Sequence, residues 1–119
     1  GPLQLAGTDD LLSGHPDVER ALAGTSGEKP LIVLTHSPAL FPQLARPGVD
    51  LVLSGHTHGG QVNLPGLGPF FLPRGSGAYP WGWYSIGNSF LFVNRGLGWS
   101  VAPWRWRAPP EIAWIFATA

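Results

Sequence analysis

Two short runs of apolar residues stand out in the first half of the chain, and a histidine closely follows each of them. Residues 31–34 read Leu-Ile-Val-Leu and precede His36, and residues 50–54 read Asp-Leu-Val-Leu-Ser and precede His56. Continuous aliphatic runs of this length are typical of strands that are covered on both faces, as in parallel sheets. The pattern therefore predicts two buried strands, each ending just before a histidine.

The segment between these runs predicts a brief helix over residues 38–45, with Leu40, Phe41 and Leu44 on one side. Strand, helix and strand within about 25 residues form a βαβ unit, in which the two strands run parallel and lie next to each other. The fold class that this predicts is α/β.

Parallel strands end at the same edge of a sheet, which is where open α/β sheets bind ligands. His36, His56 and His58 are therefore expected to converge at the carboxyl edge of the sheet. Asp50 begins its strand and is expected at the opposite edge, so we exclude it as a ligand.

The flanking segments predict further elements. Residues 3–7 indicate a short strand, and Pro16 suits the first position of a helix that ends before Gly24. Gly87-Asn88-Ser89 separates the apolar runs 84–86 and 90–93, which is typical of a tight hairpin. Residues 111–116 are expected to form a closing strand. The parallel βαβ unit is thus followed by mostly antiparallel strands, without a linker that would separate two domains.

Composition narrows the class of protein. The chain has 119 residues, a formal net charge of zero and only 12% charged residues, so its electrostatics give no reason to expect a nucleic-acid partner. It has no cysteine, which excludes disulfides and thiolate metal sites. No apolar run approaches the roughly 18 residues that a membrane-spanning helix needs.

Residues 54–61, Ser-Gly-His-Thr-His-Gly-Gly-Gln, carry the clearest chemical signal. Imidazole is the commonest protein ligand for metals such as zinc and iron, and the flanking glycines leave the backbone free to aim His56 and His58 at one small volume. The alternative is a glycine-rich turn with two solvent-exposed histidines. For His36 the alternative is a side chain that caps the following helix.

Other residues are weaker candidates. Gln61 and Arg95 are candidate substrate contacts, against a strand-start role and a surface ion pair respectively. His15 is expected in an exposed loop, and turn formation explains Asp9 and Asp10 as well as a place at the edge of the site does. A cluster of aromatic and cationic residues suits a membrane interface or a substrate with an acyl chain, although packing against a sheet is the commoner use of such aromatics: Trp99, Trp104, Arg105, Trp106 and Arg107.

Taken together, these segments resemble the calcineurin-like metallophosphoesterases, and within them the bacterial membrane-associated phosphodiesterase group. The resemblance extends in order over nearly the whole chain. It is carried by Gly7-Thr8-Asp9-Asp10, Leu34-Thr35-His36-Ser37-Pro38, residues 48–61, Leu64-Pro65-Gly66, Arg95-Gly96-Leu97-Gly98 and Pro109-Pro110-Glu111-Ile112.

The resemblance implies an αββα sandwich with two divalent metal ions, of manganese, zinc, iron or magnesium, at the carboxyl ends of its central strands. It implies that His36 and His56 bind one metal and His58 the other. It implies a phosphate-ester substrate, with a phospholipid or a nucleotide-linked lipid as candidates, and a location in the bacterial cytoplasm or at a membrane surface.

The chain also departs from the family. The aspartate-x-histidine, glycine-aspartate-x-x-aspartate and glycine-asparagine-histidine motifs, which precede these segments in the family, are absent. A pair of catalytic cations depends on carboxylates to hold it together, and three neutral imidazoles do not supply them. Residues 1–119 are therefore expected to be the carboxyl-terminal half of a metallophosphoesterase domain, inactive alone and completed by an amino-terminal half. The alternative is a noncatalytic fragment or a single-metal-binding module that acts through a partner or a membrane surface.

Overall fold

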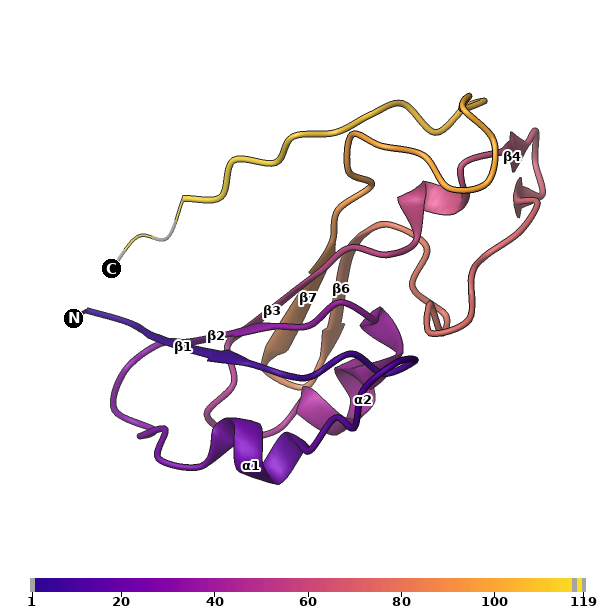
Figure 1. Cartoon of the computed structure of the whole chain (residues 1–119). Coiled ribbons are helices and arrows are strands. Elements are labelled where there is room, and N and C mark those ends of the chain that lie inside the picture. The colour runs from indigo at the N-terminus through magenta and orange to yellow at the C-terminus, as the bar shows by residue number, and fades with distance from the viewer. Residues whose placement is uncertain (1, 117, 119) are drawn as a thin grey trace.

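A computed structural model describes residues 2–116 and 118 and shows a mixed α/β chain built on one five-stranded sheet (Figure 1). The strand order is β1-β2-β3-β7-β6, in which β1, β2, β3 and β7 run parallel and β6 is antiparallel to β7. The strands are β1 (Gln4–Gly7), β2 (Leu31–Leu34), β3 (Leu51–Ser54), β6 (Gly82–Ile86) and β7 (Ser89–Val93).

The βαβ unit expected from the sequence is confirmed. β2 and β3 are parallel neighbours, with Val33 opposite Val52. The segment between them forms a 3-10 turn, η1 (Pro38–Leu40), which continues into the helix α2 (Phe41–Leu44). Pro38 opens η1 and Pro42 lies in the first turn of α2, where the N–H that proline lacks is not needed.

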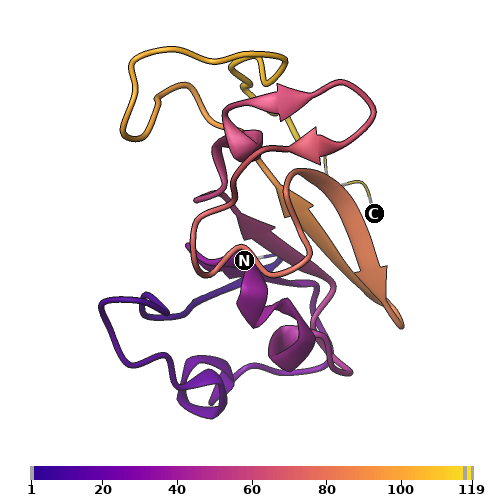
Figure 2. The ribbon, with the colours of Figure 1, turned by 90° about the vertical axis from the view of Figure 1, so that its right-hand side faces the viewer.

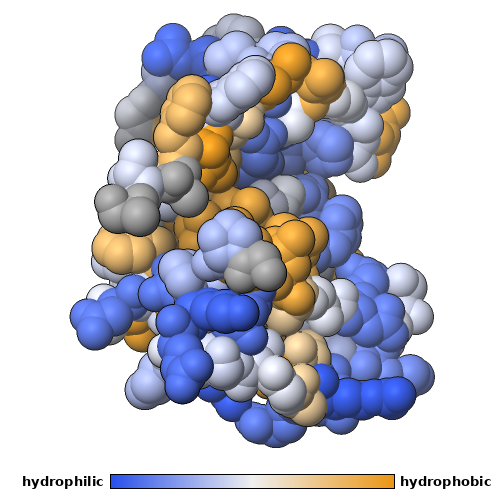
Figure 3. All heavy atoms as spheres, turned by 90° about the vertical axis from the view of Figure 1, so that its left-hand side faces the viewer, coloured by the Kyte–Doolittle hydropathy of each residue, from blue (hydrophilic) through white to orange (hydrophobic). Residues whose placement is uncertain are grey.

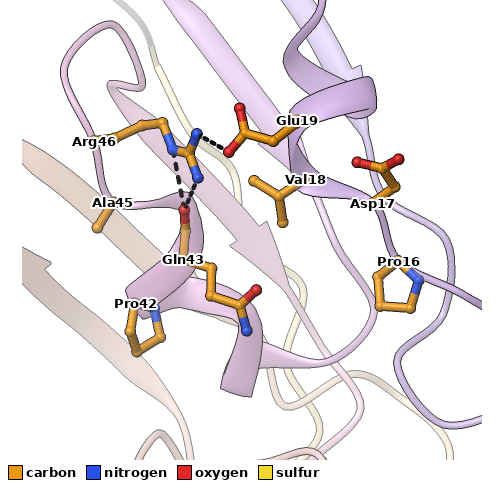
Figure 4. A pocket seen from close by; sticks show the side chains of 8 residues that line it. All are labelled: Pro16, Asp17, Val18, Glu19, Pro42, Gln43, Ala45 and Arg46. Atoms are coloured by element: carbon orange, nitrogen blue, oxygen red, sulfur yellow. Dashed lines mark hydrogen bonds and ion pairs between the residues drawn. The ribbon is translucent and has the colours of Figure 1, made fainter.

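The first helix, α1 (Val18–Leu22), begins two residues later than the sequence predicted. Asp17 stands before it as the N-cap and accepts a hydrogen bond from the backbone N–H of Arg20, which fixes the start at Val18. Glu19 of α1 pairs with Arg46, just after α2, at 2.6 Å in a surface hollow of about 530 Å³ (Figure 4). This hollow lies between the two helices, and its lining contains no histidine.

The helices cover one face of the sheet and bury the core there. Alternate strand residues point to this face, and the fully buried ones include Val33, Val52, Leu91 and Val93. Phe41 of α2 packs onto them and is itself completely buried.

The opposite face of the sheet is apolar and largely uncovered within the described residues. Register places Leu34, Leu53, Phe92 and Trp83 in one row across four strands, and a parallel row contains Leu5, Ile32, Leu51 and Phe90. Leu5 is 64% exposed, Phe90 51% and Trp83 57%. Seen from the side on which both termini lie, apolar side chains gather where the molecule is hollowed (Figure 3).

The β6–β7 hairpin is confirmed, with Gly87-Asn88 as its two-residue turn. Its β7 strand also pairs in parallel with β3, so the hairpin extends the βαβ sheet (Figure 2). A second, two-stranded antiparallel sheet consists of β4 (Asn63–Leu64) and β5 (Gly68–Pro69), and it follows the histidine turn.

The expected closing strand at residues 111–116 is wrong. This segment runs on the side of the sheet away from the helices (Figure 1), and it has no strand pairing. Only the start of the segment is tied down, by a bond from the Glu111 N–H to the Gly96 carbonyl oxygen. No described strand lies alongside the segment to form ladder hydrogen bonds with it. The side chains of Ile112 and Trp114 are about four-fifths exposed.

The tryptophans of the aromatic and cationic cluster do not pack into the core, contrary to the commoner expectation. Trp99 is 60%, Trp104 56% and Trp106 45% exposed. Among the residues that the structure describes, no helix is long and apolar enough to cross a membrane.

Candidate metal centre

His36 and His56 meet at the carboxyl ends of the neighbouring strands β2 and β3. His56 Nδ1 lies 3.0 Å from His36 Nε2, and the ring centroids are 4.6 Å apart. Ser54 at the end of β3 steadies the arrangement, because its hydroxyl donates to the His36 carbonyl oxygen at 2.8 Å. The parallel pairing of the two strands therefore brings these two imidazoles together, as the sequence predicted.

The ring of His56 has a defined proton position. Its Nε2 lies 2.6 Å from the carbonyl oxygen of Arg74. A carbonyl only accepts, so Nε2 is the donor in this contact, and Nδ1 is the ring nitrogen that faces His36. A backbone carbonyl that holds the far N–H is the usual orienting contact of a metal-binding histidine.

The backbone beside Arg74 needs a glycine. Gly75 has a φ of +89°, and a side chain there would approach the Ser37 hydroxyl oxygen to 2.9 Å and His56 Nε2 to 3.4 Å. The Ser37 side chain is fully buried and its hydroxyl has no hydrogen-bond partner in the described structure. The 74–75 segment thus closes over the strand ends and fixes the orientation of His56.

The turn that carries the histidines is strained. His56, His58 and Gln61 all have a positive φ, of 68°, 51° and 55°. Such values are uncommon outside glycine, cost on the order of 1–3 kcal/mol each and gather at functional sites. The 3-10 turn η2 (His58–Gly60) is held by Thr57, whose hydroxyl accepts from the Gly59 N–H at 3.1 Å.

His58 does not join the other two histidines in a group that could hold an ion within the described residues, so the expected convergence extends to only two of the three. The ring of His58 contacts Arg105. Arg105 Nη2 lies 3.4 Å from His58 Nδ1, and Arg105 Nη1 donates to the His58 carbonyl oxygen at 3.0 Å. Burial, and then the charge of Arg105, lower the pKa of His58, which favours the neutral form of its ring. Neutral imidazole is the form that binds metals.

Arg105 has a structural role that the sequence did not predict. It belongs to the aromatic and cationic segment, yet its guanidinium turns inward and bonds the Arg95 carbonyl oxygen at 2.9 Å and, through Nε, that of Gly98 at 2.8 Å. Most of its contacts lie 7–47 residues away along the chain, and only the Ala108 carbonyl oxygen is nearby, so no local pattern reveals the arrangement. Arg105 fixes the loop on which His58 sits.

The two candidate substrate contacts are engaged within the chain. Gln61 donates from its amide nitrogen to the Ala102 carbonyl oxygen at 2.9 Å and accepts from the Ser100 N–H at 2.6 Å. Arg95 pairs with Glu111 at 3.2 Å and packs its stem against Gly59. Both side chains hold loops in place around the histidine turn.

The acidic residues of the chain have structural roles. Asp9 accepts from the N–H groups of Asp10 and His15, and Asp10 accepts from Ser13, so both shape one turn. These hydrogen bonds lower the pKa of both carboxyls. Asp50 accepts from the Leu31 N–H at the opposite edge of the sheet, as expected from its position.

The donor set fits part of a metal site. His36 and His56 offer two ring nitrogens at one point, next to a surface hollow of about 420 Å³ at the carboxyl ends of β1, β2 and β3. Within residues 2–116 and 118, no group of three or more histidine, cysteine, aspartate or glutamate side chains is close enough to hold an ion.

Comparison with known proteins finds relatives that are named as metallophosphoesterases or as enzymes acting on phosphate compounds. An uncharacterized metallophosphoesterase of Bacillus subtilis, YkuE, is 42% identical over 110 residues, which cover 92% of this chain and 38% of the relative. The phosphodiesterase YaeI of Escherichia coli is 32% identical, over 94% of this chain and 40% of its own length. The UDP-2,3-diacylglucosamine pyrophosphatase LpxG of Chlamydia trachomatis is 32% identical, over 92% of this chain and 36% of its own length.

No family model matches the chain, and no solved structure matches it significantly. The chain spans roughly two-fifths or less of the length of these relatives, and the matches cover more than nine-tenths of the chain itself. The sequence identities to these relatives and the histidines at the strand ends support the same family. This chain belongs to the calcineurin-like metallophosphoesterase family.

Proposed function

We propose that residues 1–119 form the carboxyl-terminal half of a metallophosphoesterase domain that hydrolyses phosphoesters at a dinuclear centre of divalent metal ions. His36, His56 and His58 are its proposed contribution to the metal ligands. The bridging and remaining ligands, including carboxylates, would come from an amino-terminal half.

The observation that carries this proposal is the contact between His56 Nδ1 and His36 Nε2 at 3.0 Å, with the far nitrogen of His56 held by the Arg74 carbonyl oxygen. An oriented lone pair at the junction of two strand ends is the arrangement that metal ligation needs. The strained φ of His56 supports the same interpretation, because a folded chain keeps such a conformation where function requires it.

When bound, a pair of divalent ions would neutralise the phosphate and supply an activated nucleophile for in-line attack. The chain's own contribution is positional. Arg74 and Gly75 orient His56, while Arg105 anchors the loop of His58 and helps to keep that ring neutral.

The names of the relatives support phosphate esters as substrates, since one is named as a phosphodiesterase and one as a lipid pyrophosphatase. Within this class we propose a phospholipid or a nucleotide-linked lipid, acted on at a membrane surface. The exposed Trp99, Trp104 and Trp106 support this narrower class, because tryptophan suits the boundary between water and lipid.

The test compares the 119-residue chain with the full-length protein in hydrolysis of bis-p-nitrophenyl phosphate, both with excess manganese. We expect hydrolysis by the full-length protein and a rate lower by orders of magnitude for the chain alone, because the carboxylates are missing from it. Comparable rates would refute the division into halves, and inactivity of both would refute the phosphoesterase proposal.

The second candidate is a single-metal-binding module that acts through a partner. It is favoured by the finding that His36 and His56 touch while His58 turns toward Arg105. Upstream sequence separates the two candidates: the aspartate-x-histidine, glycine-aspartate-x-x-aspartate and glycine-asparagine-histidine motifs should precede residue 1 if the enzyme proposal is right.

A further inference from the structure

An apolar pocket of about 650 Å³ opens directly beside the histidine turn. Its volume lies in the range of about 300–1,000 Å³ that small-molecule sites occupy. Apolar side chains from two separate loops form its walls, with Phe70 and Phe71 on one loop and Val101 and Trp104 on the other.

The pocket reaches the histidine turn, because Thr57 and His58 are among its lining residues, whereas His36 and His56 are not. A molecule whose phosphate reached the histidine turn would therefore have its next atoms at the mouth of this pocket. Gln61 joins the two regions, since it follows η2 and ties down the loop of Ser100 and Ala102.

The chemistry of the lining selects an apolar occupant. It contains no aspartate, glutamate, lysine or arginine, so a charged group would find no partner. Gln61 and Thr57 use their polar atoms in hydrogen bonds within the chain, which disfavours a nucleobase that needs its edge recognised. Phe70, Phe71 and Trp104 are each more than half exposed despite their size, and exposed apolar surface of this kind is typical of binding grooves and other interaction surfaces.

Val101 adds a second sign of function. Its φ is +67°, a rare value for a β-branched residue, and its side chain is fully exposed at the pocket. A strained backbone conformation that exposes an apolar side chain to water does not stabilise the loop itself. It is explained if the side chain contacts a ligand.

We propose that this pocket binds an alkyl or acyl chain attached to the phosphate of the substrate. The inference rests on the proposed phosphoesterase function and adds to it the position of the subsite and the chemical class of the group that fills it. Phe70, Phe71, Val101 and Trp104 are its specificity-determining residues.

The test uses the full-length, manganese-loaded protein and p-nitrophenyl alkyl phosphodiesters with methyl, butyl and octyl groups. Each buried methylene should raise kcat/KM about twofold to fourfold, so the octyl ester, which is longer by seven methylenes, should exceed the methyl ester by at least about 100-fold. Val101→Asp should reduce this ratio to below about 10, since an apolar chain bound beside the carboxylate would remove water from it at a cost in free energy. Aspartate tolerates the positive φ at this position, so the backbone should keep its conformation.

Leu67→Asp is the matched control, because Leu67 is also exposed and lies outside the pocket lining. It should keep the octyl-to-methyl ratio of the unaltered protein. A ratio near one in the unaltered protein, with the methyl ester still hydrolysed, would overturn the pocket proposal and leave the phosphoesterase proposal intact. A Leu67→Asp effect as large as that of Val101→Asp would also overturn it.

A binding measurement tests the pocket proposal independently of phosphoester hydrolysis. By calorimetry, octyl phosphate should bind at least tenfold more tightly than inorganic phosphate, and Val101→Asp should remove this advantage. If no ester is hydrolysed but octyl phosphate binds in this way, the pocket stands and the phosphoesterase proposal fails. If Val101→Asp leaves the advantage intact and abolishes only binding to phosphatidylglycerol vesicles, the surface docks on membranes and the chain-binding proposal is wrong.

Discussion

His56 Nδ1 lies 3.0 Å from His36 Nε2, although the two residues are twenty positions apart in the sequence. The contact exists because β2 and β3 are parallel neighbours and end at the same edge of the sheet. The Arg74 carbonyl oxygen accepts from His56 Nε2, so Nδ1 is the ring nitrogen that faces His36.

His56→Ala should lower kcat/KM of the full-length protein for bis-p-nitrophenyl phosphate by a factor on the order of 100 or more. Loss of residues that merely orient a ligand already costs about 10–100-fold, and loss of a ligand costs at least as much. His15→Ala is the control, since only the backbone N–H of His15 is used, in a bond to Asp9. Equal effects of the two changes, measured at saturating metal, would contradict the role of His56.

Arg105→Ala should lower the free energy of unfolding by about 2–4 kcal/mol, because hydrogen bonds from a charged group to several carbonyl oxygens are lost. Arg105→Lys should recover only part of the loss, since an ammonium cannot reproduce the fork of donors. Urea denaturation of the full-length protein measures both. Arg20→Ala, on the surface of α1, is expected to change stability by less than about 0.5 kcal/mol.

The Glu111–Arg95 pair should make stability dependent on pH. Burial alone would raise the pKa of Glu111, but the hydrogen bonds and the charge of Arg95 outweigh it and lower the pKa below the ordinary 4.5. A depressed pKa stabilises the folded state above the unfolded value of about 4.5, and this contribution is lost as the pH falls through the folded value.

Glu111→Gln should therefore be less stable than the unaltered protein at pH 7, by about 1–2 kcal/mol, and nearly equal to it at pH 3. Chemical denaturation at the two pH values gives the difference. A gap that stays constant between them would mean that the ionised carboxylate adds nothing to the fold.

The bare sheet face should make the 119-residue chain self-associate, because Leu34, Phe90 and Trp83 expose apolar surface on strands with an uncovered face. Light scattering after size exclusion should show association at tens of micromolar, reduced by Leu34→Ser combined with Phe90→Ser. Leu67→Ser, on an exposed turn outside the sheet, should leave association unchanged. A monodisperse, unaltered monomer would show that the face needs no cover.

The sequence predicted the strands and the histidine contact well, because both follow from local patterns. Residues 31–34 and 51–53 are aliphatic, and parallel pairing of such strands leaves little choice for where His36 and His56 lie. The Gly87-Asn88 turn likewise defines its hairpin by local chemistry.

What could not be predicted depends on distant contacts. Residues 112–116 form a continuous apolar run, as in a buried strand, yet a strand needs a neighbour, and the sequence pattern does not say which neighbour is available. In the sequence, Arg105 is part of the aromatic and cationic cluster. In the fold, its guanidinium donates to carbonyl oxygens of loops that only the folded chain brings together. The orienting contact from Arg74 is made by the backbone and so has no side-chain signature.

The most direct test of the central claim is anomalous diffraction from crystals of the full-length protein loaded with zinc or manganese. The account predicts an anomalous peak about 2.0–2.2 Å from ring nitrogens of both His36 and His56, with a second peak near His58. Peaks confined to other residues, or none near the strand-end histidines at saturating metal, would contradict it.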